Sequence, residues 1–250
     1  AHFGKWHLAN DMIPDAPFPS EYGFDEYGAF NCSGPQMYVH DDVKSAIPFI
    51  EKSHKADKPF FINLWIHEPH TPFHVDPKLQ KRFAKLGEKD AIYAATLFHA
   101  DLRIGQLLDA LDRLKITNNT LVIFSSDNGP ARGAPDAPLT LGYDSATGLG
   151  YGIAAAKGIT GGRKGYKAAL FEGGVGVPFI ARWPGKIAAG KVDKTSIFSA
   201  VDLLPTFCEI AGVKLPASYR PDGVSQVETL QGNGIALREK PLFWKTVAPW

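Results

Sequence analysis

Two short motifs carry basic or imidazole side chains that could contact an anion. The motif Gly-Lys-Trp-His places the ammonium of Lys5 and the imidazole of His7 two residues apart, on one side of an extended chain. The motif His-Glu-Pro-His-Thr-Pro presents His67 and His70 in a turn stiffened by two prolines. Each also has an ordinary interpretation, a surface lysine beside a packed tryptophan in the first motif and a structural turn in the second.

Two further segments could hold a cation and a second basic group. Asp127 and Asn128, followed by glycine, offer a carboxylate and an amide oxygen, the hard ligands that Ca²⁺ or Mg²⁺ prefers, although the same residues are common in turns. Residues 161–167 are basic and glycine-rich, which is typical of an anion-binding loop or of a solvated one. They lack the Walker pattern, so a nucleotide cradle is disfavoured.

Apolar segments of strand length precede two of these clusters. Residues 60–66 run into the His67 turn, residues 120–125 run into Asp127, and residues 90–115 between them carry apolar side chains every three or four positions, as in a long amphipathic helix. Strand, helix and strand form a βαβ unit, and open α/β sheets bind ligands at the carboxyl edge. The sequence therefore predicts an α/β fold with a mostly parallel central sheet sandwiched by helices.

Other parts of the chain complete this expected fold. Asp41 and Asp42 offer an N-cap to a helix that runs to about Ser53. We also expect a strand at 177–183, a short helix at 201–212, an apolar strand at 241–250, and long loops without periodicity at 10–36 and 129–166.

Composition excludes several classes of protein. The 250 residues carry 27 Lys and Arg against 26 Asp and Glu, so no net field is available to hold a nucleic acid. With 44% hydrophobic residues the chain is expected to be folded and soluble, and no segment approaches the ~20 apolar residues of a membrane span. Cys32 and Cys208 have no CxxC spacing and form neither a disulfide framework nor a thiolate metal site. No targeting segment is visible, and both ends look truncated, as expected for a fragment.

Together, the four clusters combine a hard-cation site with Lys and His groups suited to a tetrahedral oxyanion and its leaving group. Sulfuryl or phosphoryl transfer is the chemistry that they indicate.

The same motifs resemble the type I, formylglycine-dependent sulfatases of the alkaline phosphatase superfamily. The resemblance extends in order from Gly4 to about Gly212. It is carried by Gly4–Leu8, Pro69–Pro72, Phe124–Gly129, and Leu170–Pro178 followed by Arg182–Gly185. It implies that residues 1–212 are part of the sulfatase catalytic domain, and that 213–250 are a linker and the start of a truncated C-terminal subdomain.

The resemblance also implies roles for individual residues. Lys5 and His7 match the pair that contacts the sulfate and the formylglycine hydrate, and His70 matches the sulfate-binding histidine better than His67 does. The catalytic set is thus Lys5, His7, His70 and Lys167, of which Lys5, His70 and Lys167 also bind the substrate.

Two of these assignments depend on position within a motif. The leaving-group lysine of the family lies five residues before the glutamate of its Glu-Gly-Gly motif, which selects Lys167, with Lys164 as the alternative. Asp127 and Asn128 match the late pair of Ca²⁺ ligands, so Ca²⁺ is the cofactor that the resemblance implies.

Two departures from the family pattern matter, and Cys32 must be distinguished from the missing nucleophile. The Cys/Ser-x-Pro/Ala-x-Arg motif that supplies formylglycine and an early Asp-Asp pair of Ca²⁺ ligands both belong upstream of residue 1, so this chain alone is expected to be inactive. Gly176 stands where the family often has arginine. Cys32 has the wrong spacing and order for the formylglycine precursor, and we expect a buried, unmodified thiol far from Lys5, His7 and His70.

The resemblance implies a Ca²⁺-dependent sulfuric ester hydrolase that acts on a sulfated carbohydrate or on an aryl or alkyl sulfate, with no nucleic-acid partner and no membrane span. Two alternatives stay open: a phosphodiesterase or phosphonate hydrolase of the same superfamily, and a non-catalytic relative that binds sulfated glycans. Asn128, where zinc phosphatases of this superfamily tend to have histidine, favours Ca²⁺ over Zn²⁺ and hence the sulfatase. The family resemblance also points to a secreted, periplasmic or lysosomal protein.

Overall fold

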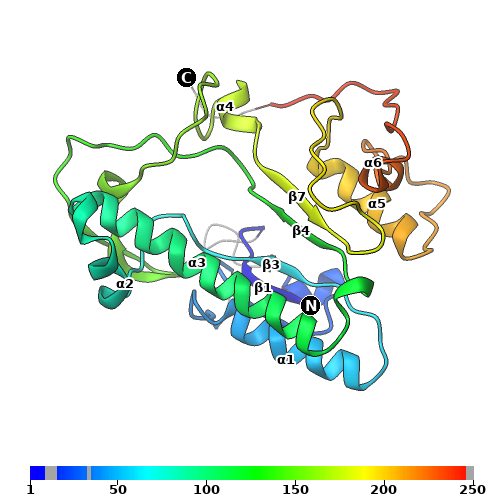
Figure 1. Ribbon diagram of the computed structural model, residues 1–250, viewed down its shortest axis with the longest axis horizontal. Coiled ribbons are helices and arrows are strands. Elements are labelled where there is room, and N and C mark those ends of the chain that lie inside the picture. The colour runs from blue at the N-terminus through cyan, green and yellow to red at the C-terminus, as the bar shows by residue number, and fades with distance from the viewer. Residues whose placement is uncertain (9–15, 33–34, 246–250) are drawn as a thin grey trace. The chain divides into compact units, whose positions relative to one another are not determined.

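The computed structural model describes residues 1–8, 16–32 and 35–245. These residues divide into two compact units (Figure 1). The first unit contains Ala1–Lys115 and Pro130–Ile159, and the second contains Ile116–Gly129 and Thr160–Trp250. The predicted boundary at residue 212 stays a prediction.

A three-stranded parallel sheet forms the centre of the first unit (Figure 1). Its strands are β1 (His2–Lys5), β2 (Tyr27–Phe30) and β3 (Asn63–Trp65), in the order β2-β1-β3. The sequence predicts β3 but neither β1 nor β2. Both missed strands are four residues long and contain glycine, which weakens the strand pattern.

Two long helices lie side by side along this sheet (Figure 1). They are α1 (Asp42–Lys55) and α3 (Glu88–Arg113), and both fall where the apolar periodicity predicts them. Phe3 and Leu64, neighbours in the parallel register, pack with Ala46 of α1 and Leu107 of α3. The short helix α2 (Pro77–Arg82) contacts α3 and begins at Asp76, whose carboxylate accepts a hydrogen bond from the Lys78 amide at 2.7 Å.

The other face of the sheet is covered by an aromatic segment of the expected 10–36 loop. Trp6, Ala29 and Cys32 form a buried cluster against which Phe24 packs. The expected burial of Cys32 is confirmed, but its expected distance from His7 is wrong, because the His7 amide donates to the Asn31 carbonyl at 3.2 Å. The reason is that the pairing of β1 with the missed strand β2 continues beyond both strands. Residues 9–15 and 33–34 of this loop lie outside the described residues.

The expected loop at 129–166 contains an antiparallel hairpin. Its strands are β5 (Leu141–Asp144) and β6 (Gly148–Tyr151), and Tyr151 also bridges to Phe73. Phe73, Ile92 of α3 and Ala155 form a buried cluster beneath the hairpin. Residues 130–159 of this loop are therefore a structured part of the first unit.

The second unit contains a two-stranded sheet of β4 (Val122–Ser125) and β7 (Phe179–Arg182). The sequence places both strands correctly, but the predicted βαβ unit of residues 60–66, 90–115 and 120–125 is wrong, because β4 pairs antiparallel with β7 in a sheet separate from that of β3. The helices of this unit are α4 (Glu172–Val175), α5 (Leu203–Ile210) and α6 (Val227–Gln231). The strand expected at 241–250 is absent from residues 241–245, and residues 246–250 lie outside the described part of the chain.

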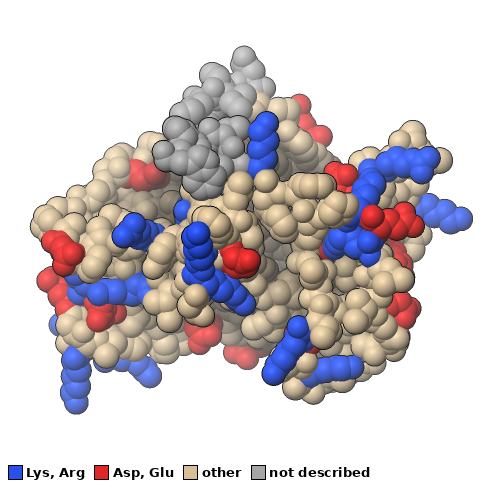
Figure 2. Space-filling view, turned by 90° about the horizontal axis from the view of Figure 1, so that it is seen from above, with Lys and Arg blue, Asp and Glu red and all other residues tan. Residues whose placement is uncertain are grey.

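Short 3₁₀ helices complete the secondary structure, at Pro19–Tyr22, Ala84–Leu86, Thr117–Asn119, Ile153–Ala155 and Ala200–Asp202. Lys and Arg are interspersed with Asp and Glu on the face shown in Figure 2, which agrees with the near-zero net charge. Among the described residues, no helix combines the length and the apolar character needed to cross a membrane.

Candidate functional site

Three predicted site residues lie at or after the ends of strands in the parallel sheet of the first unit, at its carboxyl edge. They are Lys5, His7 and His70. Gly4 of β1 pairs with Trp65 of β3, so Lys5 and the turn after β3 leave the sheet on the same side. Lys5 also pairs with Phe30 of β2, and the Phe30 ring contacts the His67 imidazole with centroids 5.8 Å apart. The parallel register therefore brings the segment containing Lys5 and the turn after β3 to one sheet edge.

The close pairing of β1 with β3 requires glycine before Lys5. Gly4 has φ of 107°, and a Cβ atom there would lie 2.0 Å from the carbonyl oxygen of Trp65. No side chain fits in this space or adopts this backbone conformation without strain. The glycine of the Gly-Lys-Trp-His motif therefore sets how closely the two strands that carry the candidate site approach each other.

The two histidines of the turn have different environments. His67 is buried and its Nε2 lies 3.0 Å from the Pro72 carbonyl oxygen, to which it donates a hydrogen bond. Burial lowers the pKa of His67 to about 4, so this imidazole is neutral near pH 7. His70 is exposed, with its ring centroid 5.7 Å from that of His67. The exposed imidazole is the better placed of the two to contact a substrate.

Asp127 and Asn128 follow directly after β4 in the second unit. The Asp127 carboxylate is exposed, and its Oδ1 accepts a hydrogen bond from the Asn128 amide at 2.9 Å. The side-chain NH₂ of Asn128 donates to the Gly129 carbonyl at 2.8 Å, which leaves the amide oxygen as a potential ligand. A carboxylate and an amide oxygen side by side form a donor set suited to a hard divalent cation.

Within the same unit, Asp127 and Asn128 are tied to the Glu-Gly-Gly motif. The Gly129 amide donates to the Gly174 carbonyl at 2.8 Å, and a Cβ atom on Gly129 would lie 1.9 Å from the Gly173 carbonyl oxygen. The Gly173 amide in turn donates to the Lys164 carbonyl at 2.8 Å. Two motifs more than forty residues apart are thus in direct backbone contact.

The two candidate lysines of this unit differ in their surroundings. The Lys164 ammonium lies 3.9 Å from the centroid of the Phe171 ring, a cation–π contact. Lys167 is exposed and is followed by Ala168, which has φ of 73°. The choice of Lys167 rather than Lys164 as the leaving-group lysine stays a prediction.

The predicted site residues are divided equally between the two units. Lys5, His7 and His70 belong to the first unit, whereas Asp127, Asn128 and Lys167 belong to the second. In the first unit the sheet brings the segments of Lys5 and His70 to one edge, and in the second unit Asp127 and Asn128 are adjacent in the chain. A single site made from both sets stays a prediction.

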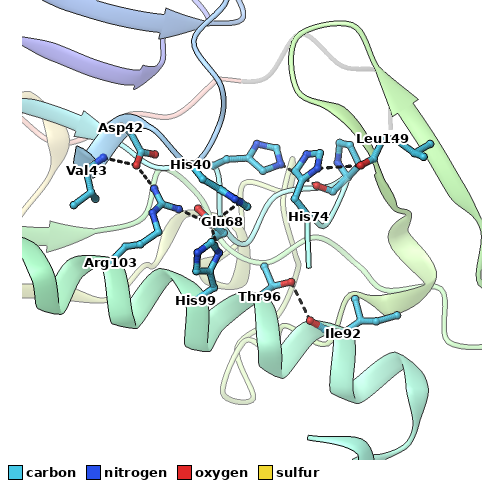
Figure 3. A network of polar contacts seen from close by, with 12 residues as sticks. His40, Asp42, Val43, Glu68, His74, Ile92, Thr96, His99, Arg103 and Leu149 are labelled. Carbon is cyan, nitrogen blue, oxygen red and sulfur yellow. Dashed lines mark hydrogen bonds and ion pairs between the residues drawn. The ribbon is translucent and has the colours of Figure 1, made fainter. Parts of the chain in front are cut away.

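The sequence analysis missed a buried polar cluster at the start of α1. Asp42 and Glu68 are buried, and both accept hydrogen bonds from the guanidinium of Arg103 on α3 (Figure 3). The sequence predicts Asp41 and Asp42 as the N-cap of α1. Asp41 occupies that position without a side-chain capping hydrogen bond, whereas the Asp42 carboxylate accepts hydrogen bonds from the Val43 amide and from Arg103. The sequence does contain one indication of this cluster. Arg103 lies in phase with the buried face of α3, where a charged side chain needs a partner of opposite charge.

Comparison with protein-family models gives a match to the model described as Sulfatase over residues 2–213. The uncharacterized sulfatase YdeN of Escherichia coli (strain K12) is 27% identical, covering 98% of this chain and 47% of that protein. The N-acetylgalactosamine-6-sulfatase of Rattus norvegicus is 29% identical, covering 96% of this chain and 47% of that protein. The chain therefore spans about half the length of the curated relatives that it matches.

A solved structure supports the same relationship. The crystal structure of Ps i-CgsB in complex with k-i-k-neocarrahexaose superimposes with a TM-score of 0.74 at 25% identity. The match covers 94% of this chain and 55% of that one.

Proposed function

The chain belongs to the sulfatase family of the alkaline phosphatase superfamily, and on that premise we propose that the whole protein is a sulfuric ester hydrolase. The observation that carries the proposal is the common sheet edge reached by Lys5 and by the turn that contains His70. An ammonium and exposed imidazoles at one sheet edge can bind a tetrahedral oxyanion and donate protons to it.

The roles of the residues follow from their chemistry. Lys5 and His70 bind the sulfate group, and His7, which is exposed directly after β1, exchanges a proton at the nucleophile. Lys167 stabilises the negative charge that builds on the ester oxygen as the S–O bond breaks, and provides a proton to the departing alkoxide.

Asp127 and Asn128 would hold Ca²⁺. Their carboxylate and amide oxygens fit a hard cation, and the hydrogen bond from Asn128 to Gly129 orients the amide for this purpose. Bound Ca²⁺ supplies positive charge that neutralises the sulfate oxygens. The remaining ligands, an early Asp-Asp pair, are expected upstream of residue 1.

The nucleophile is also expected upstream, as a formylglycine made from a Cys or Ser in the Cys/Ser-x-Pro/Ala-x-Arg motif. When present, the hydrated aldehyde of formylglycine supplies the attacking oxygen. Cys32 does not take this role in our proposal, because it is packed in a buried cluster with Trp6 and Ala29.

We propose a sulfated carbohydrate as the substrate. The names attached to two relatives, N-acetylgalactosamine-6-sulfatase and a complex with k-i-k-neocarrahexaose, both refer to sugars. In this chain, the β5–β6 hairpin carries Tyr143 with 77% of its surface exposed, a flat aromatic face on which a sugar ring can stack.

The proposal is tested with the whole protein, assayed on an aryl sulfate, an aryl phosphodiester and a panel of sulfated sugars. We expect hydrolysis of the sulfates, with kcat/KM at least about 100-fold above that for the phosphodiester. Tyr143→Ala should raise KM for a sulfated sugar and leave the aryl sulfate unaffected. Preference for the phosphodiester would favour the phosphodiesterase alternative, and binding of sulfated sugars without turnover would favour the non-catalytic one.

A further inference from the structure

The buried polar cluster around Glu68 has the donor atoms of a metal site (Figure 3). Its members are His40, Glu68 of the turn after β3, and His99 of α3, all within the first unit. One potential ligand atom from each lies within 4.8 Å of the others. None of these three residues has a role in the proposed sulfatase chemistry.

The two imidazoles direct ring nitrogens toward the same carboxylate. The Nε2 of His40 lies 3.3 Å from Glu68 Oε1, and the Nδ1 of His99 lies 3.7 Å from the same oxygen. Ligand atoms of a tetrahedral zinc site, with bonds of about 2.0–2.2 Å, are about 3.3–3.6 Å apart. The nitrogen-to-carboxylate spacings are therefore close to those that a shared ion requires.

The donor atoms are also left unsatisfied. His40 Nε2, His99 Nδ1 and Glu68 Oε2 are buried and have no hydrogen-bond partner among the described residues. Buried polar atoms without partners are costly and rare in folded proteins. Two buried ring nitrogens that face one buried carboxylate without making hydrogen bonds indicate a missing ligand.

The charge of the cluster favours a cation. Asp42 and Glu68 contribute two buried carboxylates, against the single guanidinium of Arg103. Arg103 Nη1 donates to Glu68 Oε1 at 2.6 Å, which orients the carboxylate that the two imidazoles face.

We propose that His40, Glu68 and His99 bind a divalent transition-metal ion of the Zn²⁺ type. Two imidazoles and one carboxylate match the preferences of zinc and are distinct from the all-oxygen donors at Asp127 and Asn128. A bound ion would join α3 to the turn that carries His70, and so would hold that turn in place.

The site retains a position for a further ligand. A pocket of about 280 Å³ opens beside it and is lined by His40, His99 and Arg103 together with Tyr38, Lys44 and Gln106. With three protein ligands, the fourth position of a tetrahedral ion is filled by water or by a small anion from this pocket.

The test measures metal binding to this chain and does not depend on sulfatase activity. After treatment with EDTA, the chain is titrated with Zn²⁺ by calorimetry and with Co²⁺ by visible absorption. We expect one equivalent of Zn²⁺ bound in the micromolar range or tighter, no competition by Ca²⁺, and the intense visible bands of four-coordinate Co²⁺.

Variants assign the site. Glu68→Gln, His40→Ala and His99→Ala should each weaken Zn²⁺ binding about 100-fold or more. His54→Ala on the exposed face of α1 is the matched control and should bind as the unchanged chain does. His40→Ala and His99→Ala alter only half-buried residues, so they keep the test decisive should Glu68→Gln fail to fold.

Zinc binding that is equally strong in the His40, His99 and His54 variants would overturn the proposal. So would the absence of binding to the unchanged chain.

Discussion

Replacing Arg103 by methionine should strongly destabilise the first unit. Arg103 is buried, and its guanidinium is the cation that pairs with both Asp42 and Glu68. Methionine retains much of the apolar length of arginine, so the substitution removes the charge and the hydrogen bonds while keeping most of the packing.

The size of the effect follows from burial. The side chains of Asp42 and Glu68 are 0% and 2% exposed, so neither carboxylate can recover its hydration when the guanidinium is removed. Removing one partner of a buried ion pair costs about 3–5 kcal/mol of unfolding free energy. In urea this corresponds to a midpoint lowered by roughly 1–5 M.

The same helix provides a matched control. Arg113 pairs with Glu51 at 2.6 Å, but these side chains are 58% and 42% exposed. Arg113→Met should therefore cost no more than about 1 kcal/mol. Adding Glu68→Gln to Arg103→Met should recover part of the loss, since it removes one uncompensated charge.

The assay is urea unfolding in EDTA, so that no metal contributes. Tryptophan fluorescence is followed after Trp183, Trp244 and Trp250 are replaced by phenylalanine, which leaves Trp6 and Trp65 of the first unit as the reporters. Equal midpoints for Arg103→Met and Arg113→Met would refute the reasoning that the buried triad is held by its guanidinium.

Three further predictions concern separate features of the chain. Burial lowers the pKa of His2 from 6.5 to about 4, so the unfolded chain binds the proton more tightly and stability is lost as pH falls from 6.5 to 4. The variant His2→Phe should remove about 1.4 kcal/mol per pH unit from that dependence. Unchanged pH dependence in urea unfolding would contradict this prediction. Gly4→Ala should lower the unfolding free energy by roughly 3 kcal/mol through strain and overpacking. Gly23, with φ of 89°, has no atom within 4 Å of the position that a Cβ atom would take, so Gly23→Ala should show only the smaller cost of strain. Similar unfolding midpoints for the two variants would count against the close approach of Gly4 to Trp65. In the whole protein, Lys167→Ala should lower kcat by ~10²-fold, with the largest loss on poor leaving groups, and an equal loss across a series of aryl sulfates would remove its leaving-group role.

The sequence predicts the fold best where periodicity is strong. Helices α1 and α3 and strands β4 and β7 lie where the apolar pattern places them, because their side chains repeat with the period of one element. The strands β1, β2, β5 and β6 are four residues long and contain glycine, which weakens their strand pattern. In addition, β1 and β2 are defined by partners distant in the chain. The direction of the β4–β7 pairing is likewise a tertiary property, which two apolar segments do not encode.

The candidate site is likewise predicted from the sequence only where its residues belong to short motifs. The short motifs containing Lys5 and His70 identify residues that the sheet brings to one edge, although β1 itself escaped prediction. The cluster of His40, Glu68 and His99 is not visible as a motif, because its members come from three separate segments. Only the charged Arg103 on the buried face of α3 points to it in the sequence.

Sulfate release by the whole protein, compared between His70→Ala and His54→Ala, tests the central claim most directly. Both replace an exposed histidine of the first unit, but only His70 lies in the turn at the sheet edge that also contains Lys5. We predict that His70→Ala lowers kcat/KM for a sulfate ester by ~10²-fold or more, whereas His54→Ala leaves it unchanged. Equal activity of the two variants, or no sulfate release by the unchanged protein with its formylglycine in place, would contradict the account.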